Sequence, residues 1–465
     1  MKTLVNLLLL SLFLCSCNNI SFNNQDPSSP NPAAPTTPIE APLTGSYLET
    51  WQNSLPDEFK NLTSGQFNHQ IGMNNSGDAV IAWEIHGTTK SFYLSHLKNS
   101  VWTHPQLAQP FNTNPDNYFY TNIRKILVSE SGDAKVIYSE GTNLKLYEYK
   151  NGVWVAPIII GSAMTSSSIV ATSPNGKILI ISVFGDKLAS VYFNGSTWVD
   201  HGEVKFQNNK SISSANVKYL SVAVDNSGKG YMSFSHDRGS SNYGVFRIPF
   251  DGSSWLMPAD DLTPLGASFN NRIAMNATGK VVSMWQTFDD VVHFQENSGS
   301  GWGAEYTFNP GFWVSVERME ILVSSAGEML AVWPESNLLK FYKKSGSTVS
   351  IIHSIPDTFS KFSLKAIPND KLAITWNTAN EVKYVRCDFS TCASTVTVSA
   401  LERDQTNSPM LKIIKNFDVT NDRISIFWQQ EGNANGYYVI ETSGAEESTE
   451  WLLQLLSPIV FESVT

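Results

Sequence analysis

The sequence predicts an all-β fold, a single β-propeller of eight repeated units, and one recurring spacing carries the prediction. In each unit a short turn ends in Gly or Asp. An apolar run ends six residues later, at an aromatic residue in seven of the eight units. Successive turns lie about 49 residues apart, and a period of roughly 40–50 residues in a strand-rich chain is typical of propellers, with one blade per repeat. The pairs are Gly77/Trp83, Gly132/Tyr138, Gly176/Ser182, Gly228/Phe234, Gly279/Trp285, Gly327/Trp333, Asp370/Trp376 and Asp422/Trp428.

The third unit shows how each blade should be built. Segments 168–172, 177–184, 187–193 and 197–204 are rich in strand-forming residues and are separated by Asn-Gly and Gly-Asp turns. Such turns join antiparallel strands, so each unit is expected to form one four-stranded antiparallel sheet. Eight blades follow from eight units, and seven blades with irregular ends remain the alternative. A segment before the first unit, 47–56, could pair with the last unit and close the ring.

The second strand of each unit is apolar on both faces. Residues 79–83 read Ala-Val-Ile-Ala-Trp, whereas a half-exposed strand would alternate apolar with polar residues. Blades packed face to face would cover both sides of such a strand. The aromatic residue that ends it is therefore interpreted as core between blades.

A second marker, a turn followed by Trp, closes most units. It is also interpreted as core, because a large ring at each repeat fills the wedge between neighbouring blades. Exposure of these rings in grooves between blades would instead indicate a sugar-binding surface. The closing residues are Trp102, Trp154, Trp198, Trp255 and Trp302.

The first residues form an export signal. Lys2 precedes an apolar run, residues 4–14, that is too short to span a bilayer. The run ends in Leu14-Cys15-Ser16-Cys17, which resembles the lipobox of bacterial lipoproteins. The resemblance implies a signal peptide over 1–16 and an acylated, palmitate-bearing Cys17 that anchors the chain to a membrane. Asn18 follows this Cys and, by resemblance to the enterobacterial sorting rule, implies the outer membrane of a Gram-negative bacterium, facing the periplasm or the cell surface.

The domain organisation follows from composition. Residues 17–44 hold the predicted lipid site and a tether with six prolines among Ser, Thr, Asn and Ala, which cannot bury a core. Residues 45–465 are expected to form the propeller. The formal net charge of −10 offers no basic footprint for nucleic acid, so the only partners expected are the membrane, through the lipid, and an unknown protein or glycan ligand.

Two cysteines are the only ones in the propeller segment. Cys387 and Cys392 flank the turn of the seventh unit at which other units place the closing Trp. Two cysteines across a hairpin in an exported protein are expected to form a disulfide. The eight histidines show no metal-ligand spacing, and no phosphate loop or zinc-protease motif occurs, so neither a metal nor a cofactor is expected.

The repeats resemble those grouped loosely with the sialidase or BNR superfamily. Phe246-Arg-Ile-Pro249 reproduces the Phe-Arg-Ile-Pro motif of sialidases, and the resemblance would give Arg247 a place in the triad that clamps the substrate carboxylate. The sialidase Asp-box, however, has its Trp three residues after the Gly, not six. In this sequence the motif also falls in the third strand of the fourth unit, where Pro249 would end strand pairing. No catalytic residue can be assigned.

The sequence therefore predicts a membrane-anchored lipoprotein whose propeller is a binding or scaffolding module for protein, rather than an enzyme. A lectin-like, carbohydrate-binding propeller is the first alternative, and a sialidase-like glycoside hydrolase is the second. Exposed Trp rings in equivalent grooves would favour the lectin. Three exposed arginines converging near the axis with a Tyr–Glu pair would favour the hydrolase.

Overall fold

The structure, a computed structural model, describes residues between 69 and 442, all within the unit Ile39–Thr465. The expectations for the signal peptide, Cys17, the tether and segment 47–56 therefore lie outside the described residues. Inside the described span, the segments not described are 87–89, 99–100, 103–105, 111–121, 162–167, 185–186, 207–211, 214–215, 239–242, 264–267, 288, 311–318, 346–347, 358–360, 368–369, 379–380, 400–411, 420–422 and 431–435.

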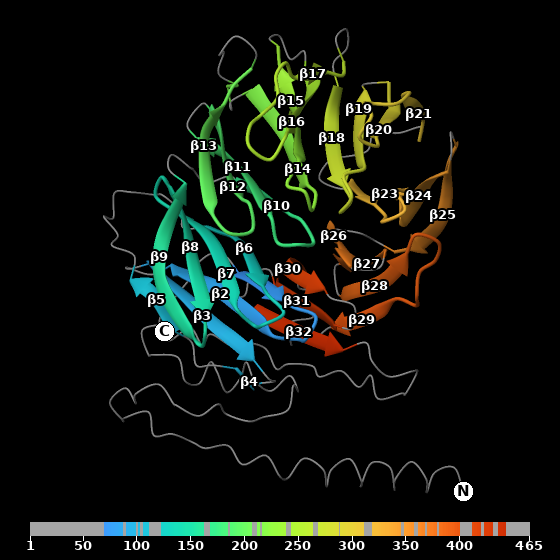
Figure 1. Cartoon of the computed structure of the whole chain (residues 1–465). Helices are drawn as coiled ribbons and strands as arrows, with labels where there is room; N and C mark the ends of the chain where they lie inside the picture. The colour runs from blue at the N-terminus through green and yellow to red at the C-terminus, as the bar shows by residue number, and fades with distance from the viewer. Residues whose placement is uncertain are drawn as a thin grey trace, which may run out of the picture. The chain divides into compact units, whose positions relative to one another are not determined.

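The described residues form eight antiparallel sheets, one for each repeat (Figure 1). Six sheets have four strands in sequence order, which confirms the predicted blade. The first sheet has a fifth strand, and three strands of the last are described. The number of blades in the complete ring stays a prediction, because both ends of the chain lie outside the described residues.

The strands of the first four sheets, in chain order, are β1 (His69–Met73), β2 (Ala79–His86), β3 (Lys90–Lys98), β4 (Val101–Trp102), β5 (Gln106–Pro110); β6 (Asn122–Val128), β7 (Ala134–Glu140), β8 (Asn143–Lys150), β9 (Val153–Gly161); β10 (Ser168–Thr172), β11 (Ile178–Phe184), β12 (Lys187–Phe193), β13 (Trp198–Val204); β14 (Val217–Val224), β15 (Gly230–Asp237), β16 (Tyr243–Phe250) and β17 (Asp260–Asp261).

The strands of the last four sheets are β18 (Ser268–Met275), β19 (Val281–Thr287), β20 (Val292–Asn297), β21 (Tyr306–Phe308); β22 (Glu320–Val323), β23 (Met329–Glu335), β24 (Leu338–Ser345), β25 (Thr348–Pro356); β26 (Lys361–Ile367), β27 (Lys371–Asn377), β28 (Val382–Asp388), β29 (Val396–Ser399); β30 (Lys412–Val419), β31 (Arg423–Gln430) and β32 (Gly436–Thr442).

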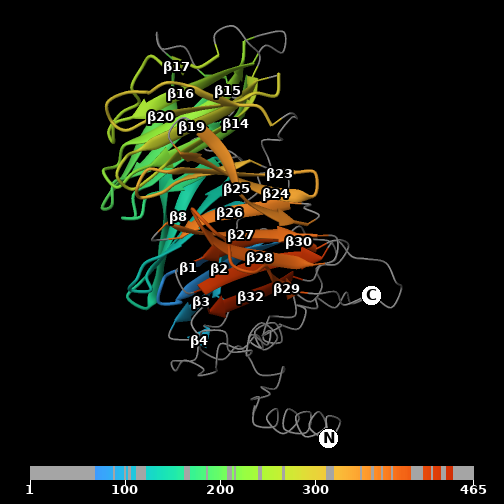
Figure 2. The ribbon, with the colours of Figure 1, turned by 90° about the vertical axis from the view of Figure 1, so that its right-hand side faces the viewer.

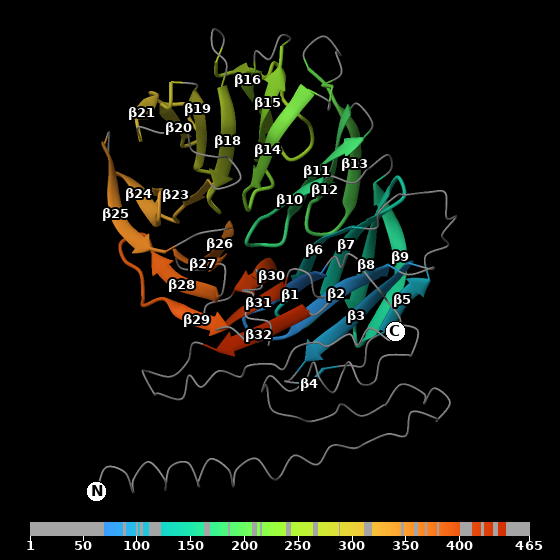
Figure 3. The same cartoon turned by 180° about the vertical axis from the view of Figure 1, so that it is seen from behind.

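The first strands of the sheets form a closed inner ring. Each contacts the first strand of the next sheet, from β1 to β6 and onward to β30, and β30 contacts β1. Figures 1 and 3, which view the ring from opposite sides, both place β6, β10, β14 and β18 toward the middle and β9, β13 and β25 toward the outside. The eight first strands therefore surround the axis of the ring, where propellers have their central channel. The fold is an all-β propeller, as the sequence predicts.

The second strands hold neighbouring sheets together. On β23, Met329, Ala331 and Trp333 pack in a buried cluster shared with the preceding sheet. The alternate residues Leu330 and Val332 pack in another cluster, shared with the following sheet. Figure 2 shows this sheet, β22–β25, beside β26–β29. The strand is covered on both faces, which confirms the interpretation of its unbroken apolar run.

The repeated aromatic residues whose side chains are described are core. Trp285, Trp333 and Trp376 are at most 1% exposed. Trp333 stacks on a tyrosine of the adjacent strand, with ring centroids 3.9 Å apart. The closing tryptophans whose side chains are described are half-buried against the interfaces between sheets. They are Trp154, Trp198, Trp255 and Trp302.

The turns before the second strands of the first six sheets share one geometry. In the fifth sheet the Gly279 N–H donates to the Asn276 carbonyl (3.2 Å), and the Asn276 side-chain oxygen accepts from the Lys280 N–H (2.9 Å). Gly279 has a φ of 92°, in the left-handed region that a residue without a Cβ adopts at no steric cost. This geometry explains why the repeat is marked by glycine.

The same turns are hydrogen-bonded from one sheet to the next. The Asn276 side-chain amide donates to the Ser324 carbonyl of the following turn (2.8 Å). In the first sheet the Asn74 amide donates to the Ser129 carbonyl in the same way (2.6 Å). The sequence shows a polar residue three positions before six of the eight anchors, but its role in joining blades became evident only from the structure.

Candidate ligand site in the channel

A hollow of about 290 Å³ lies on the channel side of four consecutive sheets. It is lined only by first strands, β10, β14, β18 and β22. Its polar lining residues are Ser221, Arg272 and Glu320. The remaining lining residues are Ile169, Leu220, Val222, Ile273 and Ile321. We call this space the channel hollow. It combines a few convergent polar groups with apolar walls, which is the usual composition of a ligand pocket.

The polar residues of the hollow also join neighbouring blades. The Ser221 hydroxyl on β14 accepts from the backbone N–H of Ile273 on β18 (3.1 Å). The Nε of Arg272 donates to the Met319 carbonyl (2.9 Å), next to β22. The guanidinium is therefore held across a blade interface in one orientation. Fixing it in this way reduces the entropy lost when a ligand binds.

Glu320 faces Arg272 across this interface. Burial of the carboxyl raises the pKa of Glu320 above its ordinary value, and the nearby positive charge of Arg272 opposes the shift. A guanidinium donates in a planar fork, and a carboxyl offers two oxygens. Together they can bind paired hydroxyl groups or an acidic group on a ligand.

The first strands are irregular beside the hollow. The β14–β15 register shifts between Lys218 and Ser221, and the β18–β19 register shifts between Phe269 and Asn271. Tyr219 has a φ of 54°, and its side chain is 37% exposed. A bulky residue in the left-handed region is strained, and both strain and bulges gather at functional sites.

Arg247 does not have the role that the sialidase-like motif implies. It is 3% exposed and donates from Nε to Asp260 on β17 (2.9 Å). Its guanidinium lies 3.3 Å from the ring centroid of Trp302, which belongs to the next sheet. Arg247 is thus a packing element between two blades, where a substrate carboxylate has no access. The expectation that Pro249 ends strand pairing is wrong, because β16 pairs with β15 on both sides of that residue.

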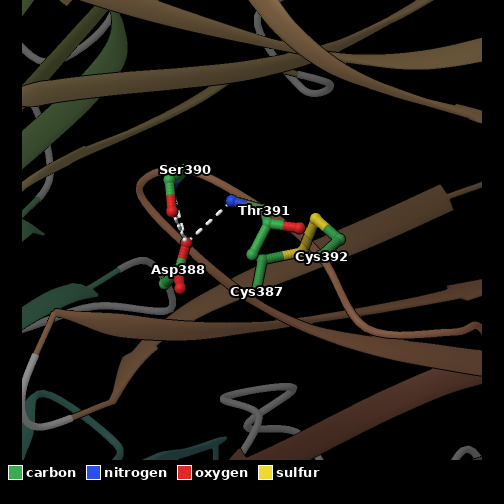
Figure 4. Close-up of a disulfide and its surroundings, with 5 residues drawn as sticks. All are labelled: Cys387, Asp388, Ser390, Thr391 and Cys392. Atoms are coloured by element: carbon green, nitrogen blue, oxygen red, sulfur yellow. Dashed lines mark hydrogen bonds between the residues drawn. A yellow bond between two sulfur atoms is a disulfide. The ribbon is translucent and has the colours of Figure 1, made fainter.

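The structure contains the predicted disulfide between Cys387 and Cys392. Figure 4 shows it closing the turn from β28 toward β29, where Asp388 accepts from the N–H groups of Ser390 and Thr391, both at 2.7 Å. The two cysteines form a bridge pair between strands. The same kind of bridge joins two closing tryptophans, Trp255 and Trp302, to the strands before them. The disulfide therefore takes the place that a closing Trp has in the fourth and fifth units.

Other candidate groups are accounted for by local contacts. Asp260 pairs with Arg247, and Asp261 pairs with Arg238. His96 is fully buried against the ring of Tyr149. Over the described part of the chain, no group of three or more His, Cys, Asp or Glu is placed to hold a metal ion. In the same residues there is no helix of the length and apolarity that a membrane crossing requires.

No protein-family model matches the chain, and no curated protein matches it. Among solved structures, it is similar to the SapL1 lectin in complex with alpha methyl fucoside (13% identity, 61% of this chain and 96% of that one, TM-score 0.37). It is similar to an ulvan lyase of polysaccharide lyase family PL25 (12%, 69% and 92%, TM-score 0.43) and to the Aleuria aurantia lectin with alpha-methyl-L-fucoside (11%, 70% and 95%, TM-score 0.31). At these identities and TM-scores, the similarities say nothing about what this chain binds.

The channel hollow is not among the sites that the sequence predicts. Its residues share one feature that could have revealed it: Ile169, Ser221, Arg272 and Glu320 each lie seven residues before the Gly of their repeat. The residue type at this position differs among the four repeats, from Ile to Ser, Arg and Glu. A search for repeat positions with unusual polarity would have indicated them.

Proposed function

We propose that this chain is a carbohydrate-binding module that holds a sugar in the channel hollow. The observation that carries the proposal is the lining: a fixed guanidinium, a carboxyl and a hydroxyl converge between walls of Ile, Leu and Val. A sugar ring presents hydroxyl groups at its edge and C–H groups on its faces, which matches such a lining. The volume is near the lower end of the roughly 300–1,000 Å³ of ligand pockets, so it suits one small ring better than a protein segment.

Binding of a glycan by the purified full chain tests the proposal. On a glycan array we expect selective binding, and we expect Arg272→Ala to abolish it. Arg238→Ala is the matched control, because Arg238 lies outside the channel hollow and pairs with Asp261. Equal glycan binding by both variants, or no selective glycan binding by the wild type, would contradict the proposal.

A protein-docking role has one specific observation in its favour. Four of the large apolar residues that are highly exposed lie on β9: Val153, Val155, Ile158 and Ile159. Among the described strands β9 pairs only with β8, so its other edge can accept an added strand. For this role, a photo-crosslinker at Val155 should give a discrete adduct that Ile159→Lys removes. Ile351→Lys, on the outer strand β25, should keep the adduct, and loss of it in both variants would contradict docking at β9.

We also propose that the propeller is tethered to a bacterial outer membrane through Cys17. The lipobox-like residues before Cys17 support this, as does the Pro-rich segment that follows. Cys17→Ala should move the chain from the membrane fraction to the soluble fraction and abolish labelling with palmitate. Membrane retention or continued labelling of this variant would contradict the anchor.

A further inference from the structure

One interface between neighbouring sheets is filled differently from the others. In the described part of the ring, five interfaces each hold a cluster of eight to eleven buried apolar residues. The cluster between the fourth and fifth sheets has three: Ala223, Ile273 and Val281. The first strands of these two sheets, β14 and β18, both line the channel hollow. The interface behind the hollow is therefore the one with the least apolar filling among those described.

Two serines take the place of an apolar pair in this interface. In each of the other five, the residue five positions after the Gly that ends one turn shares a buried cluster with the residue four positions after the Gly or Asp of the next turn. These pairs are Ala82/Val136, Ile137/Ile180, Ile181/Met232, Met284/Ala331 and Val332/Ile374. The corresponding residues of the fourth and fifth sheets are Ser233 and Ser283. The repeat thus predicts two hydroxyl groups facing each other where other interfaces are apolar.

The strand register confirms that both serines point into this interface. Ser233 is directly opposite Arg247 in the fourth sheet, so their side chains share one face. That face is turned toward the fifth sheet, because the Arg247 guanidinium lies against the ring of Trp302. Ser283 is directly opposite Ile273, whose side chain packs in the cluster shared with the fourth sheet. The two hydroxyl groups therefore come from facing sides of neighbouring blades.

Four polar atoms in this interface have no hydrogen-bond partner among the described residues. They are the hydroxyl oxygens of Ser233 and Ser283, Nη1 of Arg247 and Oδ1 of Asn271. All four residues are buried. An unpaired buried polar atom is costly, and folded proteins pair nearly all such atoms, either within the protein or with ordered water. We call these four residues the polar seam.

The chemistry of the polar seam calls for a neutral partner that both donates and accepts hydrogen bonds. Nη1 of Arg247 can only donate, Oδ1 of Asn271 can only accept, and each serine hydroxyl can do both. An anion would be repelled by the Asn271 oxygen, and the charge of Arg247 is already balanced by Asp260 at 2.9 Å. A cation would be repelled by the guanidinium. The partner must also be small, because both sheets bury these side chains.

We infer that the polar seam is a binding site for buried water, which joins the fourth and fifth sheets through the hydroxyl groups of Ser233 and Ser283. A buried water typically makes about three hydrogen bonds to polar groups that the protein leaves unpaired, and the polar seam supplies four. In the strand register, Ser233 lies beside Ser221 and Ser283 lies beside Ile273, and both of these partners line the channel hollow. The water therefore lies one strand behind the wall of the hollow. This inference does not depend on what the hollow binds.

A crystal structure of the full chain, at a resolution that shows ordered water, tests the inference directly. We expect at least one water molecule within hydrogen-bond distance of both serine hydroxyls, with a further bond to Nη1 of Arg247 or to Oδ1 of Asn271. An interface with no density between the two serines would overturn the inference. An anomalous signal at this position in a crystal soaked in bromide would also overturn it, because the site would then hold an anion.

Alanine variants give an independent test, because wet and dry hydroxyl groups predict shifts of opposite sign. If water pairs the hydroxyls, Ser233→Ala and Ser283→Ala each remove a hydrogen bond, and each unfolding midpoint should fall by about 1 °C or more. If the hydroxyls are dry, removing one relieves an unpaired buried group, and the midpoint should rise. Ser235→Ala is the matched control: its hydroxyl accepts from the Asn271 amide (3.0 Å), so its midpoint should fall in either case. A raised or unchanged midpoint for Ser233→Ala or Ser283→Ala would overturn the buried water.

Discussion

Strands β18 and β19 are neighbours in one sheet, yet they are built on opposite principles. On β19, six consecutive residues from Val281 to Gln286 are buried, and the strand is regular. On β18 the register shifts at Asn270, which has a φ of 59°, and Arg272 reaches out to line a hollow. In this sheet the second strand is buried on both faces. The first strand carries polar residues that line the hollow, and its register is irregular. The contrast shows that the packing residues and the residues of the proposed ligand site lie on adjacent strands of one sheet, so substitutions can address them separately.

The largest expected effect is the loss of a second-strand aromatic. Trp333→Ala should lower the free energy of unfolding by about 3–5 kcal/mol, because it removes a fully buried ring and leaves a cavity. Trp285→Ala and Trp376→Ala should have similar effects. Thermal denaturation measures this, with the exposed Ile351→Ala as a control that should stay within about 0.5 kcal/mol of wild type. Midpoints within a degree of wild type for all three Trp variants would contradict the conclusion that these rings stabilise the core between blades.

The disulfide should have the next largest effect. Replacing Cys387 and Cys392 together by Ser should lower the free energy of unfolding by roughly 2 kcal/mol, because the closed loop is short and constrains the unfolded chain modestly. Mass spectrometry of non-reduced peptides checks the bond, and denaturation checks the energy. Freely alkylating thiols in the native wild type would refute the bond.

The turns that join the blades should contribute slightly less. Asn276→Ala removes the amide that donates to Ser324 and the oxygen that accepts from Lys280, at a cost of about 1–2 kcal/mol. Thr278→Ala, in the same turn, is the control, because its hydroxyl bonds only within the turn. If the two variants were equally stable, hydrogen bonds between turns would not hold the blades together.

The smallest effect is a pH dependence at Glu320. Because burial raises the pKa of this carboxyl above its ordinary value of 4.5, its protonated form stabilises the fold at low pH, and this stability is lost as the pH rises through the raised value. Glu320→Gln cannot ionise, so it should unfold at a higher temperature than wild type at pH 7 and show little difference near pH 4. Denaturation at the two pH values measures this. A constant difference, or a less stable variant at pH 7, would show that Arg272 outweighs burial.

The sequence predicts the buried second strands of the blades better than it predicts the hollow lined by the first strands. The spacing from Gly327 to Trp333 identifies a turn and a strand covered on both faces, because burial constrains residue type at every repeat. The disulfide was also predictable, since Cys387 and Cys392 occupy the place of a closing Trp. The hollow was not, because residues such as Arg272 and Glu320 differ from unit to unit and acquire meaning only when the ring brings their strands together. The role that the sialidase-like motif implies for Arg247 is wrong. The local sequence matches the family motif, but Trp302 of the neighbouring sheet packs against the guanidinium and buries it.

Binding in the channel hollow is tested by the shift in unfolding midpoint that a glycan selected on the array produces in the full chain. A ligand that binds only the folded state raises the midpoint according to its affinity and concentration. We expect this glycan to raise the midpoint of wild type, and to raise that of Arg272→Gln much less. Comparing each protein with and without ligand cancels any change in its own stability. An equal rise in both proteins would contradict the assignment of binding to the first strands.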